Sequence, residues 1–404
     1  MNVIIVNDYA FVNGGAGSVA INMAKLLAKY GNNVILFTAV GPIDRKLQTF
    51  PNLKVICLYQ DDLVNNKNRL QAVVNGLWNC KAAIELKKIL SEYKPCDTIV
   101  HIHTLSKALS TSIILLAKRK GFKIIYQMHD YGIACPNMGF FDYKSNTICV
   151  HRSMSLECIV CNCDKRSYWQ KLWRVMRQVI QLKLGGLPNK VDCLISVSNF
   201  SLKILKPYIP TKKKIEVLPN IINIKRKDRV KAEENKKYIF IGRLMKEKNP
   251  NILAYVGRKL GLEVVFIGAG SEEQSIKNLN SQAIITGWLN SKDISQYMNQ
   301  ARALVFTSKW YECHPLTVLE ALAYGIPVIT SDGCAAIDQV IDGVNGRWFK
   351  NNDVESLCDV LEDFYDDNNV AEYSKKAYKI YWNNRVEEKE YYDKLVKIYR
   401  DLID

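Results

Sequence analysis

The stretch from Phe306 to Asp332, FTSKWYECHPLTVLEALAYGIPVITSD, contains the local pattern on which the fold depends. A strand ends early in it and a polar loop follows. Pro315, whose fixed φ suits the first turn of a helix, then precedes a helix over residues 316–324. Gly325 is placed to end that helix, and a second apolar run follows it. Strand, helix and strand in this order predict a βαβ unit of a parallel sheet.

The same alternation runs through most of the chain in two series, separated by a polar, basic linker near Val217–Asn220. The predicted strands are Val3–Val6, Val34–Thr38, Thr98–His101, Lys123–Met128 and Cys193–Val197 in the first series, and Tyr238–Ile241, Glu263–Ile267, Ala283–Thr286, Ala303–Thr307 and Pro327–Thr330 in the second. We therefore predict an α/β fold of two facing Rossmann-like domains, over residues 1–218 and 219–384, with parallel sheets and helices on both faces.

The end of the chain predicts one more element. Tyr391, Leu395, Ile398 and Leu402 recur at helical spacing within residues 385–404, which is typical of an amphipathic helix. The pattern alone does not say on which domain this helix packs.

Composition agrees with a two-domain globular protein. The 404 residues are 48% hydrophobic and 24% charged, which is enough to bury two ordinary cores. The first thirty residues do not resemble a signal peptide, and no apolar run is long enough to span a membrane. We therefore expect a cytoplasmic location, where the twelve cysteines stay mostly reduced.

The charge calls for an anionic partner. The chain has 56 basic and 40 acidic residues, a formal net charge of +16. No RNA-binding signature accompanies this excess, so we expect no nucleic-acid partner. Phosphate groups of a substrate, or an anionic membrane surface, are the partners left.

Two acids bracket the loop and helix that follow the strand near Thr307. Glu312 belongs to the loop and Glu320 to the second turn of the helix, so both can face one ligand. A carboxylate accepts two hydroxyl donors well, which suits a ribose diol or sugar hydroxyls. The free amides of Leu316 and Thr317, at the helix start, can hold a diphosphate. The alternative is a pair of solvated surface acids.

Two cations follow the first strand of the second series. Gly242 and Arg243 come directly after Tyr238–Ile241, and Lys248 precedes the next helix. Positive charge here can neutralise a diphosphate leaving group, which also argues against a glycosidase interpretation of the two acids. Ordinary surface bases are the alternative.

The first strand runs into a glycine-rich turn, Gly14-Gly15-Ala16-Gly17. Backbone at such a turn can approach a phosphate or a sugar closely, so the turn that holds Gly15 and Gly17 is a candidate for ligand contact. The spacing is not G-x-G-x-x-G, and no acid ends the second strand, where Thr38 and Ala39 lie. Both observations argue against a nicotinamide-dependent dehydrogenase.

His129 and Asp130 follow the strand Lys123–Met128 immediately. The carboxyl end of a buried strand is where α/β sheets bind ligands, so His129 is a candidate catalytic or positioning residue. A hydrogen-bonded structural histidine is the alternative.

Together these motifs resemble those of the family-four retaining glycosyltransferases, which have the GT-B architecture. Glu312 and Glu320 match the family's E-x7-E region, except that Cys313-His314 replaces the usual Gly-Phe. Gly242-Arg243 and Lys248 are similar to its G-R-x-x-x-x-K diphosphate clamp, and the segment at His129 resembles its histidine beside the donor sugar.

The resemblance extends over nearly the whole chain and implies further properties. It implies that Glu320 binds the nucleotide ribose, that Glu312 contacts the sugar, and that the terminal helix crosses back to the first domain. It also implies front-face substitution with retention of configuration, in which the donor phosphate receives the acceptor proton and no cofactor is required. A UDP- or GDP-linked sugar is the implied donor, and a glycan or lipid-linked molecule the implied acceptor.

Five cysteines follow His129. Cys135, Cys149, Cys158 and Cys161, with Cys163 nearby, include one C-x2-C pair and could supply four thiolates to a structural zinc ion. Reduced thiols packed in a loop are the alternative. Such a zinc ion would hold the loop together and would take no part in sugar transfer.

Residues 165–184, KRSYWQKLWRVMRQVIQLKL, predict a basic amphipathic helix. Its expected apolar face holds Trp169, Leu172, Trp173, Met176 and Ile180, and the opposite face holds Lys171, Arg174, Arg177 and Gln178. The helix either lies on an anionic membrane or covers the core with a solvated basic face. Membrane contact would make the protein peripheral on the inner face of the plasma membrane.

The sequence thus predicts a retaining, hexosyltransferase-like glycosyltransferase of surface polysaccharide synthesis. Two alternatives stay open: a noncatalytic sugar-nucleotide-binding protein, and a nucleotide-sugar epimerase or hydrolase on a similar fold. Turnover separates the first from a transferase, and dependence on an acceptor separates the second.

Overall fold

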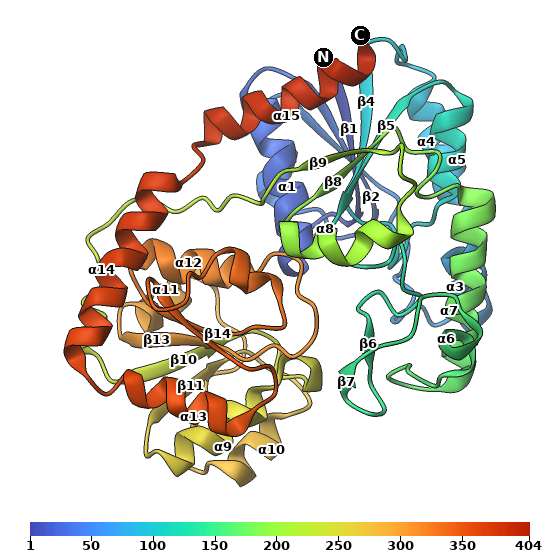
Figure 1. Ribbon diagram of the computed structural model, residues 1–404. Coiled ribbons are helices and arrows are strands. Elements are labelled where there is room, and N and C mark those ends of the chain that lie inside the picture. The colour runs from blue at the N-terminus through green and yellow to red at the C-terminus, as the bar shows by residue number, and fades with distance from the viewer.

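The protein folds into two α/β domains joined by a linker and by the C-terminal helices (Figure 1). The computed structural model describes the backbone of all 404 residues and every side chain except that of Ser291. Each domain contains one sheet of parallel strands covered by helices, so the predicted fold class is confirmed.

The first domain is built on a seven-stranded sheet with the order β3-β2-β1-β4-β5-β8-β9. Its strands are β1 (Asn2–Tyr9), β2 (Asn33–Val40), β3 (Leu53–Cys57), β4 (Thr98–Ile102), β5 (Lys123–Met128), β8 (Cys193–Ser196) and β9 (Lys214–Val217). The central strand β1 is parallel to both neighbours, with Val3 opposite Val34 and Ile99. Helices cover both faces of this strand, which explains its continuous apolar run.

Helices of several lengths surround this sheet. They are α1 (Gly14–Lys29), α2 (Arg45–Gln48), α3 (Arg69–Leu77), α4 (Cys80–Leu90), α5 (Ser112–Arg119), α6 (Leu156–Val160), α7 (Tyr168–Ile180), the π-helical turn η1 (Gln181–Gly185), α8 (Asn199–Leu205) and the 3₁₀ turn η2 (Lys206–Tyr208). A short hairpin of β6 (Phe141–Asp142) and β7 (Thr147–Ile148) lies in the segment after β5.

The second domain has a six-stranded sheet with the order β12-β11-β10-β13-β14-β15. Its strands are β10 (Lys237–Ile241), β11 (Glu263–Ile267), β12 (Ile284–Ile285), β13 (Ala301–Phe306), β14 (Val328–Ser331) and β15 (Gly346–Phe349). Its helices are α9 (Pro250–Lys259), α10 (Glu273–Leu279), α11 (Ser291–Met298), α12 (Leu316–Tyr324), α13 (Val354–Asp363) and α14 (Asp367–Asn384), with 3₁₀ turns η3 (Ala232–Glu234), η4 (Lys246–Lys248) and η5 (Ala335–Asp338).

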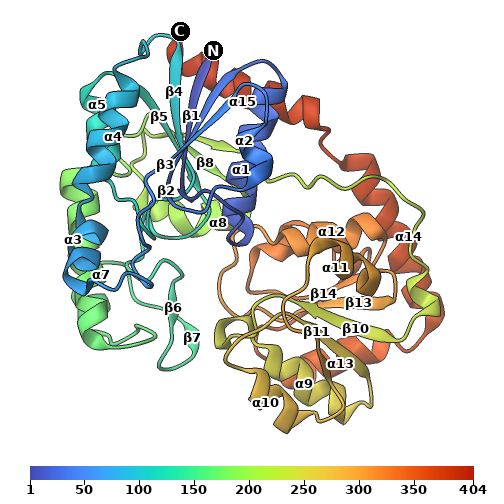
Figure 2. The ribbon, with the colours of Figure 1, turned by 180° about the vertical axis from the view of Figure 1, so that it is seen from behind.

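The terminal helix α15 (Glu388–Ile403) returns to the first domain and lies beside α1 (Figure 2). Tyr391, Leu395 and Tyr399 are fully or almost fully buried in the same core as β1. The preceding helix α14 packs on α12 of the second domain. The chain therefore crosses between the domains twice, once in the linker and once between α14 and α15.

Helix α7 does not present the solvated basic face that the sequence led us to expect. Lys171 and Gln178 are buried, whereas Trp169 and Met176, from the expected apolar face, are exposed. The polar side chains find specific partners inside the domain, which is why this side packs inward. The expectation that the basic side is solvated is therefore wrong.

Within the described residues, no helix combines the length and the apolar character needed to cross a bilayer.

Candidate active site

The predicted site residues come together where the loops of the two domains meet. The hydroxyl of Tyr131, just after β5, donates to the backbone oxygen of Glu312 at 3.3 Å. A Cβ added at Gly15, at the start of α1, would lie 4.0 Å from the Cδ1 atom of Leu316, at the start of α12. The glycine turn of the first domain and the start of α12 thus face one another, as the carboxyl ends of parallel strands allow.

Glu312 is held by three donors in the loop after β13. Its Oε1 atom accepts hydrogen bonds from the Ser308 hydroxyl and the Trp310 indole, both at 2.6 Å, and it forms an ion pair with Lys248. Burial alone would raise the pKa of Glu312, but the charge and hydrogen bond of Lys248, with those of Ser308 and Trp310, outweigh burial and lower it. Glu312 is therefore an anion fixed in place before any sugar arrives.

Lys248, assigned to the diphosphate by resemblance, is thus paired with the acid assigned to the sugar. The Lys248 side chain is only 16% exposed and also lies over the rings of Phe306 and Trp310. Lys248 and Glu312 form one charged unit at the end of β13. A diphosphate and a sugar bound here would share this unit.

Glu320 has the opposite environment. Its carboxylate lies on α12, and among the described residues no ion pair or hydrogen bond to it is found. Burial raises the pKa of Glu320 to about 7. A mostly buried acid without a partner costs stability, and such groups are concentrated at binding sites. The hydroxyl donors of a ribose would satisfy it.

The N-terminus of α12 is open to a ligand. Its N-cap residue, Pro315, has no side chain to cap the helix, and within the described chain the amides of Leu316 and Thr317 have no backbone or side-chain acceptor. Arg243, which is more than half exposed, offers a mobile positive charge at the end of β10, with Glu247 3.6 Å away. This arrangement can bind the oxygens of a diphosphate.

Glycines let two loops of the second domain approach closely. Gly268 has φ +144°, and a Cβ there would lie 1.9 Å from the backbone oxygen of Gly242. Any other residue would push the loops after β10 and β11 apart. Gly268 is therefore needed to keep Arg243 in place.

The glycine turn of the first domain divides into two roles. Gly15 is exposed beside Leu316, in agreement with a ligand contact. Gly17 is buried, and a Cβ there would meet the Phe11 oxygen and the Asn7 amide at about 4 Å. These are ordinary packing distances, so a donor contact of Gly17 stays a prediction, and Gly14, with φ +79°, makes the turn itself.

His129 is the outermost of three stacked histidines. Its Nε2 atom lies 2.9 Å from Nδ1 of His103, and the His103 ring stacks on that of His101. His101 in turn bonds the hydroxyl of Tyr399 on α15 at 2.7 Å. Burial, followed by the proximity of His314, lowers the pKa of His129 to about 3. His129 is therefore neutral near pH 7 and can hydrogen-bond a sugar hydroxyl without carrying charge.

The loop between Glu312 and Glu320 has Cys313 where the family usually has glycine, and its backbone is not strained there. Cys313 has no positive φ and is buried in the core of the first domain, where it packs against residues near Tyr131. Burial lowers the pKa of His314 to about 4, and its Nδ1 atom has no partner. His314 is a second neutral imidazole near His129, which motif analysis did not assign to the site.

One predicted zinc ligand, Cys158, and the nearby Cys163 contact a buried lysine. Lys171 is fully buried, and its Nζ atom lies 3.2 Å from Cys163 Sγ and 3.6 Å from Cys158 Sγ. Among the described residues, no three His, Cys, Asp or Glu side chains are placed to hold a metal ion. Zinc at Cys135, Cys149, Cys158 and Cys161 stays a prediction, which metal analysis of the purified chain would test.

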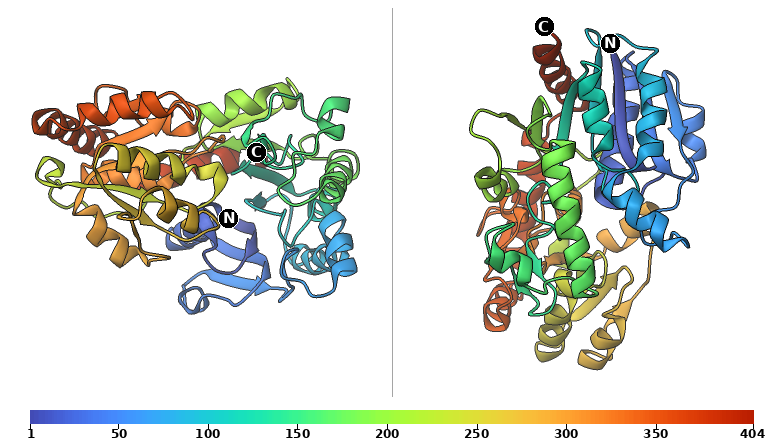
Figure 3. Two further views of the ribbon diagram at one scale, coloured as in Figure 1. Left: turned by 90° about the horizontal axis from the view of Figure 1, so that it is seen from below. Right: turned by 90° about the vertical axis from the view of Figure 1, so that its right-hand side faces the viewer.

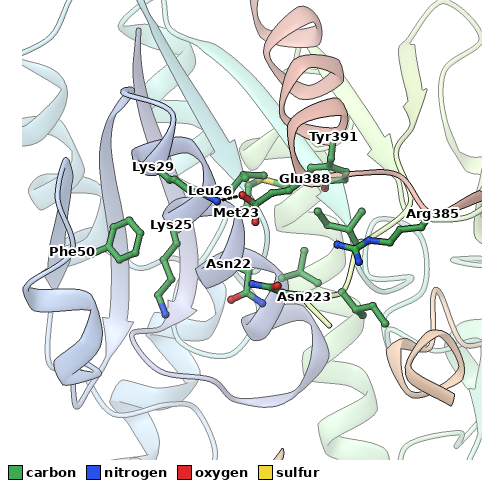
Figure 4. Close-up of a pocket in the computed structure, with 13 residues that line it drawn as sticks. Asn22, Met23, Lys25, Leu26, Lys29, Phe50, Asn223, Arg385, Glu388 and Tyr391 are labelled. Carbon is green, nitrogen blue, oxygen red and sulfur yellow. Dashed lines mark hydrogen bonds and ion pairs between the residues drawn. The ribbon is translucent and has the colours of Figure 1, made fainter. Parts of the chain in front are cut away.

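A pocket of about 230 Å³ lies away from these loops, between the outer side of α1, the linker and the start of α15 (Figure 4). Lys29 and Glu388 form an ion pair at its wall, and Arg385 lies on the opposite side. None of the predicted site residues lines this pocket. We assign the site to the facing loops because partnerless polar groups gather there.

Two facing Rossmann-like domains, each with a parallel sheet covered by helices, define the GT-B class of fold. The chain belongs to Glycosyltransferase Family 4, whose model matches residues 13–226, and the model for Glycosyl transferases group 1 matches residues 222–380.

Curated relatives are distant. A UDP-Gal:alpha-D-GlcNAc-diphosphoundecaprenol alpha-1,3-galactosyltransferase of Escherichia coli is 26% identical over 62% of this chain and 57% of its own length. An uncharacterized 41.2 kDa protein in the cps region of Klebsiella pneumoniae is 22% identical over 53% of this chain and 63% of its own length. The match thus spans about three-fifths of each of these two relatives.

Solved structures agree on the fold. Sucrose-phosphate synthase from Thermosynechococcus elongatus superposes with a TM-score of 0.73 at 15% identity, over 99% of this chain and 98% of that one. The Anabaena protein Alr3699/HepE, solved in complex with UDP, superposes with a TM-score of 0.67 at 14% identity over the full length of both chains.

Proposed function

We propose that this protein is a retaining glycosyltransferase. It would move a sugar from a nucleotide-diphosphate sugar to a glycan or lipid-linked acceptor in surface polysaccharide synthesis. The observation that carries the proposal is the pair of contrasting acids. Glu312 is fixed as an anion by Lys248, while Glu320 is partly buried, and among the described residues no hydrogen bond or ion pair to it is found.

Each part of a nucleotide-sugar donor has a matching group. Glu320 would accept the ribose hydroxyls, the amides of Leu316 and Thr317 with Arg243 and Lys248 would bind the diphosphate, and Glu312 would orient the sugar. Alr3699/HepE, of similar fold, has been solved with UDP-glucose, which supports a uridine donor.

The mechanism that we propose is front-face substitution, in which the donor phosphate rather than a side chain receives the acceptor proton. His129 and His314 are held neutral by burial, so they would hydrogen-bond sugar hydroxyls without adding charge beside the leaving group. In front-face substitution the bond from the anomeric carbon to the phosphate breaks, and the acceptor oxygen bonds the same face. The leaving phosphate takes the acceptor proton, while Arg243 and Lys248 stabilise its charge.

The acceptor would meet the sugar from the first domain. The E. coli relative is named for an acceptor carried on diphosphoundecaprenol, which supports a lipid-linked acceptor here. A cytoplasmic location on the inner face of the plasma membrane would suit such an acceptor.

The test is acceptor-dependent turnover. The purified protein is incubated with UDP-glucose, UDP-galactose or GDP-mannose, with and without a polyprenyl-diphosphate-linked monosaccharide, and nucleotide release and product are followed. We expect release only with acceptor, and an α-linked product by NMR. Release without acceptor would favour a hydrolase or epimerase, and a β-linked product would overturn retention.

A further inference from the structure

Helix α7 turns its apolar side away from the protein. Trp169 is 80% exposed, Met176 45% and Val179 44%, while Lys171 and Gln178 on the other side are buried. A helix that covers a core normally does the reverse. In the right-hand view of Figure 3 this helix, in green, runs along the outside of the molecule.

Specific contacts fix this orientation. The buried side of α7 donates from Lys171 to two cysteine sulfurs and from the Gln178 side chain to the Ile133 oxygen at 3.2 Å. Arg174 forms an ion pair at 2.6 Å with Asp164, which is buried. Rotating the helix to hide its apolar side would break all of these interactions.

Helix α3 extends the apolar surface. Leu70, Val73 and Val74 are 80%, 43% and 59% exposed. The two helices are in contact, because the Trp173 indole donates to the Val73 oxygen at 3.4 Å and its ring packs at Gly76. We name the set Leu70, Val73, Val74, Trp169, Met176 and Val179 the α3–α7 surface.

Exposed basic residues outnumber exposed acids in the segments that contain the α3–α7 surface. Within residues 61–74 and 150–184 the exposed charged side chains are Lys67, Arg69, Arg152, Lys165, Arg166 and Lys183 against Asp61 and Glu157. Six bases minus two acids leave a charge of +4. A second copy of this chain, packed by the same surface, would bring two such charges together. An anionic lipid surface would neutralise them.

We propose that the α3–α7 surface docks on an anionic membrane, with Trp169 at the level of the headgroups and the basic side chains on the lipid phosphates. The helices lie on the bilayer rather than cross it. This inference uses no feature of the donor site and holds whatever reaction the protein catalyses.

The test is co-sedimentation of the full chain with phosphatidylcholine vesicles, either pure or with about 30% phosphatidylglycerol. We expect binding to the anionic vesicles, weakened by high salt. The variant Val74→Ser/Trp169→Ala/Met176→Ser should lower the partition coefficient about tenfold or more. A matched control, Tyr255→Ser/Ile284→Ser, removes similarly exposed apolar residues of the second domain and should bind as the native chain does.

Absence of binding to both kinds of vesicle, or binding that the triple variant leaves unchanged, would overturn the proposal. So would a dimer in sedimentation velocity that the triple variant dissociates, since a second copy would then cover the surface. Should the triple variant fail to fold, Trp169→Phe gives a second readout. Brominated lipids should quench native tryptophan fluorescence and quench this variant less, and equal quenching would contradict the docking.

Discussion

Glu320, which we propose binds the ribose, should cost stability while no ligand is bound. The unfolded chain ionises this carboxyl near its usual pKa of 4.5, whereas burial raises the folded pKa to about 7. The folded state therefore holds the proton more tightly, and the contribution of Glu320 to stability, full below pH 4.5, is lost as pH rises through 7.

We expect Glu320→Gln to stabilise the nucleotide-free protein above pH 7 by about 1–3 kcal/mol, because the amide carries no charge to bury. The gain should vanish near pH 5. Urea unfolding at both pH values measures this, and a variant that is less stable at pH 8 would contradict the environment described for Glu320.

Lys248 and Glu312 should depend on each other. Lys248→Met leaves a buried carboxylate without its cation and should lower the free energy of unfolding by about 3 kcal/mol. The double variant Lys248→Met/Glu312→Gln removes both charges and should recover part of that loss. Denaturant unfolding of the single and double variants tests the coupling, which would be refuted if their effects simply added.

His103 should position His129. Nδ1 of His103 and Nε2 of His129 lie 2.9 Å apart and form a hydrogen bond. This bond fixes which nitrogen of His129 faces the sugar. His103→Leu removes it and should lower kcat about tenfold, the worth of one hydrogen bond, with little change in the KM of the donor.

Two readouts separate positioning from a merely structural role of His103. The ¹⁵N shifts of His129 should change in His103→Leu, since its tautomer is no longer fixed. An unchanged kcat together with unchanged shifts would mean that His103 only fills the core.

At the scale of elements, α15 anchors the first domain through a buried bond. Tyr399 and His101 are both fully buried, and the Nε2 atom of His101 has no partner. Tyr399→Phe should leave that ring without any hydrogen bond and cost about 1–3 kcal/mol of stability. Tyr392→Phe, which loses a bond to Asn32 near the surface, is the control and should cost less. Equal losses in thermal unfolding would argue against the anchor.

Most elements could be predicted because their patterns are local. The strands β5 and β11 have the predicted bounds, since each is a short, mostly apolar run that is buried after its first residue. The edge strands β3, β9 and β15 were not predicted. Charged residues such as Lys54, Glu216 and Arg347 interrupt their apolar patterns, which an edge position tolerates.

Site residues were predicted where a motif spaces them, and missed where the fold brings them together. The turn Glu312 to Glu320 is local, but the pairing of Glu312 with Lys248 joins two loops. His101 lies within β4 and His103 directly follows it, and neither was assigned to the site until the fold showed His103 stacked between His101 and His129. The orientation of α7 depends on cysteines and carbonyls elsewhere in the first domain, so helical periodicity alone could not predict it.

At the scale of the whole molecule, the two domains hold different parts of the proposed site. The first contributes Gly15 and His129, and the second contributes Lys248, Glu312 and Glu320, with Tyr131 bonding across. The chain crosses between the domains through the linker and again before α15, so neither domain presents the complete site by itself (Figure 1). Donor binding is therefore expected to stabilise the protein as a whole.

The most direct test of the donor site is the thermal stability of the native chain and of Glu320→Gln with UDP, GDP, ADP, NAD or short RNA. A nucleoside diphosphate at 100 times its dissociation constant should add about 2.7 kcal/mol of stability to the native chain. We expect one diphosphate, and neither NAD nor RNA, to give this effect, and Glu320→Gln to lose it. No response to any diphosphate, or an equal response in the variant, would contradict a nucleotide-sugar site at these loops.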